Sequence, residues 1–100
     1  MDNNKHKEII LTIIEKCPEL TFDNDGYQYL SQDIKDKYKD EIDIIETILK
    51  KYIEGFVEFN NFKPRKDGNI CIRCQYYWGN RFTGVGYFNI DDIFHQDNKN

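Results

Sequence analysis

Residues 70–89, which read ICIRCQYYWGNRFTGVGYFN, decide the fold that this sequence predicts. The stretch is rich in β-branched and aromatic side chains, which favour strands. Gly79-Asn80 in its middle suits a two-residue hairpin turn with glycine first. We therefore expect two antiparallel strands, residues 69–78 and residues 81–90, joined by that turn.

A third strand is predicted before this hairpin, at residues 55–62. It is followed by a turn at residues 63–68 that contains Pro64 and Asp67-Gly68, both of which favour turns. The three strands then form an antiparallel meander. After them we expect a short turn at residues 91–94 and a flexible polar tail at residues 95–100.

The first half of the chain is predicted to be mainly helical. A stripe of apolar residues at helical spacing predicts a first helix that begins near residue 3 and ends before Pro18. The stripe consists of Ile9, Ile10, Ile13, Ile14 and Cys17. Residues 20–30 follow as two short β-prone runs around an Asp-Gly turn, which predicts a small hairpin.

Residues 31–54 carry a second apolar stripe, with Ser31 as a cap and Gly55 as a stop. No Gly or Pro interrupts the stripe, so one long helix is the first interpretation, and two helices with a turn near residue 40 is the alternative. The predicted fold class is α+β. It consists of an N-terminal helix, a short hairpin, a long helix and a three-stranded antiparallel β-meander packed on the helices, in a single domain of residues 1–100.

The composition indicates a water-soluble chain that is able to bury a core. Of its 100 residues, 39% are hydrophobic and 32% charged. Its apolar runs, such as Ile9-Ile10-Leu11, are far shorter than the roughly 20 residues of a membrane span. Its start does not resemble a secretory signal. We therefore expect a cytoplasmic protein with no membrane partner, and its three cysteines as reduced thiols.

The charge is unevenly distributed. Residues 1–54 carry 8 basic and 13 acidic groups, a balance of −5, and residues 55–100 carry 6 basic and 5 acidic groups, a balance of +1; together these give the net charge of −4. We therefore expect the acidic helical half to complement a basic partner.

Two motifs resemble metal sites, and neither is complete. Cys71 and Cys74 have the spacing of half a zinc site, but residues three apart in a strand point to opposite faces. Residues 23–26 resemble the start of a calcium loop, yet its first and twelfth ligands would be Thr21 and Gln32 rather than acids. We expect no metal and no cofactor.

The sequence offers no catalytic set. Its two histidines, His6 and His95, lie in predicted frayed ends, whereas a general base must be held within hydrogen-bond reach of its target. The carboxylates of the long helix pair with lysines and form a solvated face. We therefore expect a protein that is not an enzyme.

The final hairpin is the most informative feature for function. A two-residue turn at Gly79-Asn80 predicts a register that pairs Trp78 with Arg81, Tyr77 with Phe82, Gln75 with Gly84, Arg73 with Gly86 and Cys71 with Phe88. One face of this ribbon is then expected to pack on the helices. Its residues are Ile70, Ile72, Cys74, Tyr76, Trp78, Val85 and Tyr87.

The other face would expose aromatic rings around a shallow hollow left by two glycines, which often mark a bulge or a close approach. Tyr, Phe and Arg dominate binding hot spots. The predicted partner-binding residues are Arg73, Gln75, Tyr77, Phe82, Gly84, Gly86 and Phe88. A β-edge contact or a homodimer through this sheet is one version of the hypothesis. A strongly twisted sheet, or a core that uses both faces, is the alternative.

A nucleic-acid contact is a second hypothesis, and it uses four basic residues: Lys63, Arg65, Lys66 and Arg81. If the long helix breaks near residue 40, the element order also permits a winged-helix fold. Its recognition helix would begin Asp40-Glu41-Ile42-Asp43, and these acids oppose binding to a polyanion. We therefore expect a small acidic protein-binding domain. An inhibitor or immunity-type protein that acts on a basic or nucleic-acid-handling partner fits this size and charge.

Overall fold

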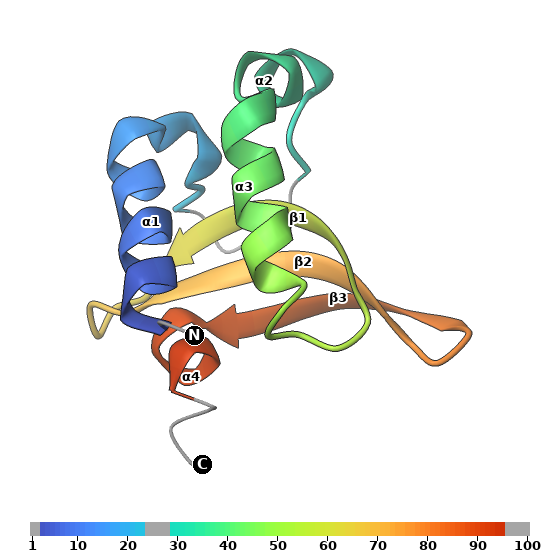
Figure 1. Ribbon diagram of the computed structural model, residues 1–100. Helices are drawn as coiled ribbons and strands as arrows, with labels where there is room; N and C mark the ends of the chain where they lie inside the picture. Colours follow the sequence, from blue (N-terminus) through green and yellow to red (C-terminus); the bar gives the residue numbers. More distant parts are fainter. Residues whose placement is uncertain (1–2, 24–28, 96–100) are drawn as a thin grey trace.

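The computed structural model describes residues 3–23 and 29–95, without the side chains of residues 3, 78, 82 and 83. Its elements are α1 (Asn3–Lys16), the 3-10 helix η1 (Pro18–Leu20), α2 (Gln32–Lys37), α3 (Lys39–Leu49), β1 (Phe56–Pro64), β2 (Ile70–Trp78), β3 (Arg81–Asn89) and α4 (Ile90–Phe94). The strands form one antiparallel sheet in the order β1-β2-β3. Helices α1 and α3 lie side by side across one face of this sheet (Figure 1). The predicted α+β arrangement is therefore confirmed.

The segment after α1 runs to the edge of the sheet. Pro18 opens η1, and Thr21 then forms a parallel bridge with Phe62 of β1. The Phe22 amide donates to the Phe62 carbonyl at 2.9 Å. The first arm of the hairpin predicted for residues 20–30 thus contacts β1. Residues 24–26 of its turn and residues 27–28 of its second arm lie outside the described residues.

Two helices, rather than one long helix, occupy residues 32–49. The Ser31 hydroxyl caps α2 by accepting from the Ile34 amide at 3.3 Å. The helix stops at Tyr38, whose φ of −113° and ψ of 31° leave helical geometry. The Tyr38 hydroxyl donates to Oε1 of Glu19 at 2.5 Å, and the same oxygen binds Nζ of Lys37 at 2.9 Å. Hydrogen bonds therefore link the break between α2 and α3 to the segment that follows α1.

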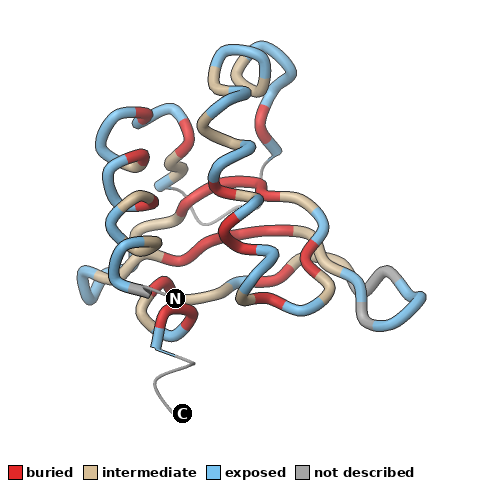
Figure 2. Tube along the Cα trace, viewed as in Figure 1, coloured by how far each residue is buried: buried red, intermediate tan, exposed pale blue. Residues whose placement is uncertain are grey.

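The core lies between the sheet and the helices, and Figure 2 shows the buried stretches of the helices turned toward the strands. Apolar residues from α1, η1, α3, the strands and α4 form it, among them Ile10, Leu20, Ile45, Leu49, Phe59, Phe62, Ile72, Cys74, Ile93 and Phe94.

Helix α4 closes this core beside the start of α1. The Asn89 side chain caps α4 by accepting from the Asp91 amide at 2.8 Å. Nζ of Lys7 lies 2.7 Å from Asp91, and the rings of Tyr52 and Phe94 pack with centroids 4.8 Å apart. The residues predicted to form a short turn after the last strand therefore form a capped helix.

Candidate interaction surface

The predicted hairpin register holds only next to the turn. Trp78 pairs with Arg81 and Tyr77 with Phe82, and Gly79 has a φ of 66°, as a turn with glycine first requires. Tyr76 then pairs with Gly84, so that one extra β3 residue lies between the two pairs. This is a β-bulge, and its Gly84 has a φ of 102°, in the region that favours glycine.

The bulge moves the rest of β3 by one residue, and the predicted pairs beyond it are wrong. The observed pairs are Gln75 with Val85, Cys74 with Gly86, Arg73 with Tyr87, Ile72 with Phe88 and Cys71 with Asn89. Because side chains alternate along a strand, a shift by one residue moves each of them to the other face. The predicted contact set is therefore split between the two faces of the sheet.

Gly86 does not leave a hollow for a partner. Gly86 pairs with the fully buried Cys74, on the helix side of the sheet. A Cβ on Gly86 would lie 2.6 Å from Cε2 of Phe88 and 2.8 Å from Cε1 of Tyr76. These two rings pack edge to face with centroids 5.9 Å apart. The glycine is thus needed for a close approach within the sheet itself, and Phe88 packs against the core rather than facing outward.

The opposite side of the sheet keeps part of the predicted surface. Its residues, which we call the open sheet face, are Arg73, Gln75, Tyr77, Val85 and Tyr87. Tyr77 is 40% exposed and Tyr87 is 53% exposed, whereas Ile72, on the helix side of β2, is wholly buried. Arg73, Gln75 and Tyr77 were predicted to share a face, and they do. The side chain of Phe82 lies outside what the structure describes.

A buried arginine lies beneath the exposed Tyr87. Asn61 of β1 pairs with Arg73, and a register shift between Phe59 and Asn61 makes Asn60 the extra residue beside this pair. All three side chains are nearly inaccessible, and Arg73 is only 2% exposed. Its guanidinium carbon lies 5.3 Å from the centroid of the Tyr87 ring. Burial of a cation is costly unless polar groups and π faces stabilise it, so this arrangement holds Tyr87 against a fixed charge.

The cysteines lie apart as the strand alternation predicted. Cys71 pairs with Asn89 and Cys74 with Gly86, on opposite faces, and both are free thiols. Burial raises the pKa of Cys74 to about 12. It also raises the pKa of Cys17, where burial is the main cause. Within residues 3–23 and 29–95, no three His, Cys, Asp or Glu side chains are grouped as metal ligands would be. Residues 24–26 of the calcium-like loop lie outside that part of the chain.

The histidines differ in their surroundings. His6, predicted to fray, lies within α1, and its Nδ1 is 2.7 Å from the hydroxyl of Tyr52. His95 is exposed at the end of α4.

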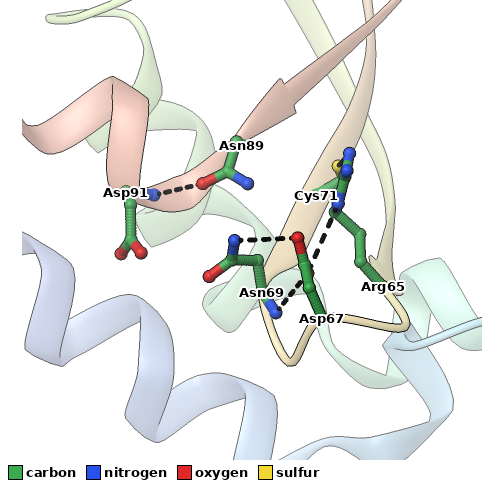
Figure 3. A network of polar contacts seen from close by, with 6 residues as sticks. All are labelled: Arg65, Asp67, Asn69, Cys71, Asn89 and Asp91. Atoms are coloured by element: carbon green, nitrogen blue, oxygen red, sulfur yellow. Dashed lines mark hydrogen bonds and ion pairs between the residues drawn. The ribbon is translucent and has the colours of Figure 1, made fainter.

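The four basic residues of the nucleic-acid hypothesis do not form one surface. Lys63 donates to the carbonyl of Asp23 at 3.1 Å. Arg65 lies 3.6 Å from Asp67 and 3.8 Å from the Cys71 sulfur, in a turn that Asp67 and Asn69 also stabilise (Figure 3). The exposed Lys66 lies in the same turn. Arg81 begins β3 at the opposite end of the sheet, one strand length or about 26 Å away.

Glu46 is a partly buried carboxylate that sequence reasoning placed on a solvated helix face. Its Oε2 accepts from the Phe59 amide at 3.0 Å and so ties α3 to β1. Burial raises its pKa above the ordinary value, although the Phe59 hydrogen bond acts in the other direction. It lines a hollow of about 220 Å³ beside the Lys35–Glu58 ion pair. Glu46 follows Ile42 of the apolar stripe by four residues, which is about one helical turn. This spacing was the sequence signal that Glu46 is partly buried.

Comparison with known proteins gives no relative. No family model, no curated protein and no solved structure matches this chain. In the described part of the chain, no helix is both long and apolar enough to cross a membrane.

Proposed function

We propose that this chain is a protein-binding domain and that the open sheet face contacts its partner. The observation that carries the proposal is the half-exposed Tyr87 ring beside the buried guanidinium of Arg73, with the exposed ring of Tyr77 on the same face. Tyr and Arg are the side chains most often found at the energetic centre of protein interfaces.

The surface is also held in place before binding. Tyr77 lies on the regular strand β2, and its amide donates to the Gly55 carbonyl at 2.6 Å. Tyr87 pairs with the buried Arg73 from the neighbouring strand. A tyrosine on a paired strand has few torsions left to order, so binding costs less conformational entropy than it would from a loop.

The partner that fits best is a basic protein. Residues 1–54 carry the balance of −5, and the first turns of α3 hold the exposed acids Asp40 and Asp43 and the half-buried Glu41. An inhibitor or immunity-type role toward a basic or nucleic-acid-handling partner remains the class that agrees with this size and charge. The division of the basic residues between the two ends of the sheet argues against nucleic acid as the ligand.

The test is affinity capture from the native host with three baits: the wild type, the Tyr77→Ala/Tyr87→Ala double variant and the control Leu11→Ala. Leu11 is an exposed apolar residue on α1, away from the sheet. We expect the double variant to lose at least about tenfold in partner affinity, as hot-spot truncation does, and the control to retain it. Equal capture by the double variant, with an unchanged circular dichroism spectrum, would contradict the proposal.

A further inference from the structure

A small hollow with an acidic lining lies where α2 and α3 meet β1, an edge strand of the sheet. Its volume is about 220 Å³, and we call it the acidic hollow. Pockets that hold drug-sized ligands measure roughly 300–1,000 Å³, so this smaller space suits one long side chain better than a whole small molecule. Its charged lining consists of two lysines and four acids, a balance of −2: Lys35, Lys39, Asp36, Asp43, Glu46 and Glu58.

The two lysines of the acidic hollow already have acidic partners. Nζ of Lys35 lies 3.2 Å from Oε2 of Glu58, and Nζ of Lys39 lies 3.6 Å from Oδ2 of Asp43. Among the residues that the structure describes, no lysine or arginine forms an ion pair with either of the other two acids. The surplus negative charge therefore lies at the exposed Asp36 and the half-buried Glu46.

Glu46 is the member of this lining that can still accept a cation. The Phe59 amide occupies only part of an ionised carboxylate, which accepts about four hydrogen bonds. Burial is the main cause that raises the pKa of Glu46, and the charges of Glu58 and Asp43 act in the same direction. The paired lysines therefore do not cancel the negative field at Glu46. Carboxylates perturbed in this way occur preferentially at functional sites.

We propose that the acidic hollow receives one arginine side chain of the basic partner, whose guanidinium binds Glu46. The apolar part of the lining, Leu30, Ile42 and Phe59, gives the methylene stem of that arginine a surface to pack against. Arginine suits a carboxylate better than lysine does, because its planar guanidinium donates two parallel hydrogen bonds and is less strongly hydrated. Its charge offsets the surplus negative charge of the lining, which a neutral or acidic side chain would not do.

The acidic hollow adjoins the open sheet face. Glu58, which lines the hollow, pairs across the sheet with Gln75 of that face. The three strands span about 10 Å from β1 to β3, so a partner that covers Tyr77 and Tyr87 reaches the hollow within the same contact. The assignment of the arginine to the partner rests on the proposed function, whereas the affinity of the hollow for a guanidinium does not.

A titration with a single blocked arginine tests the hollow by itself. The probe is N-acetyl-L-arginine methylamide, which carries the guanidinium charge and no other. The backbone amide of Phe59 reports on binding in NMR spectra, because it donates to Glu46. We expect a saturable shift of its signal with a Kd in the millimolar range. The matched control is N-acetyl-L-citrulline methylamide, a neutral molecule of nearly the same shape, and we expect it to leave the signal unchanged.

Two variants of equal net charge separate the hollow from the overall charge of the protein. Glu46→Gln removes a charge from the lining, and Asp33→Asn removes one from an exposed position of α2 outside it. We expect Glu46→Gln to bind the arginine probe at least about tenfold more weakly than the wild type, and Asp33→Asn to bind it equally well. The proposal is overturned if the wild type shows no saturable shift, if the citrulline compound causes the same shift, or if both variants bind alike.

Affinity capture with the same two variants tests whether the arginine belongs to the partner. We expect Glu46→Gln to lose at least about tenfold in partner affinity and Asp33→Asn to retain it. Unchanged capture by Glu46→Gln, beside lost capture by Tyr77→Ala/Tyr87→Ala, overturns the role of the hollow and leaves the proposed function standing. The opposite result contradicts the open sheet face and supports the hollow. The tyrosine variant should bind the arginine probe as the wild type does.

Discussion

Both faces of strand β2 carry buried residues, but their surroundings differ. On one face Ile72 and Cys74 lie under the helices in a wholly apolar setting. On the other, Arg73 is nearly as inaccessible, yet it pairs with the buried Asn61 of β1 and lies against the ring of Tyr87. Burial alone therefore does not identify the hydrophobic core. On the face without helices, the buried residues are polar and lie beside a register shift in β1.

The largest expected effect comes from truncation on the helix-packed face. Ile72→Ala removes a fully buried side chain from the centre of the sheet, and we expect a loss of about 2–5 kcal/mol in the free energy of unfolding. Gln75→Ala, on the open face of the same strand, should change it by no more than about 0.5 kcal/mol. Urea unfolding measures both. A similar loss for the two variants would remove the distinction between the faces.

A smaller effect tests on which face Gly86 lies. Gly86→Ala forces a methyl group within 3 Å of the rings of Phe88 and Tyr76, and we expect a loss of about 1–3 kcal/mol from overpacking. The double change Gly86→Ala/Phe88→Leu should recover part of this loss because it removes the nearest ring atoms. An exposed Gly86, as the sequence suggested, would tolerate alanine well, and a neutral result by urea unfolding would restore that register.

How far the sequence predicts this structure depends on whether the determining contact is local. The limits of α1, the turn at Gly79-Asn80 and the alternation along β2 follow from neighbouring residues, and each was predictable. The bulge in β3 was not, because a glycine in a strand is compatible with both a bulge and a regular register. One residue of slip was enough to transfer Val85 and Tyr87 to the open face.

The helix break and the candidate surface depended on contacts between distant segments. Tyr38 continues the apolar stripe without a phase change, and the break is accompanied by its bond to Glu19, nineteen residues earlier. In the sequence, Asn60 and Asn61 resemble exposed strand residues. In the structure, both are buried beside the register shift in β1. Three of the seven predicted contact residues, Arg73, Gln75 and Tyr77, do lie on the open face, because β2 itself is regular.

The smallest expected effect concerns Glu46, the charged group on the helix-packed side. Its pKa is raised by burial, so the folded state prefers the protonated form, and ionisation above that pKa costs stability. Glu46→Gln keeps an oxygen that accepts from the Phe59 amide but carries no charge. We expect the variant to gain stability relative to the wild type near pH 7. The gain should disappear below about pH 3.5, where Glu46 is protonated in both folded and unfolded chains.

The matched control for this prediction is Glu46→Ala, which removes the acceptor as well as the charge. It leaves the Phe59 amide without that oxygen, and we expect a loss of about 1 kcal/mol at low pH, where charge no longer contributes. Urea unfolding of the three proteins at both pH values separates the two effects. If Glu46→Gln is instead less stable than the wild type at pH 7, the ionised carboxylate stabilises the contact between α3 and β1. The helix-packed face would then tolerate a charge as the open face tolerates Arg73.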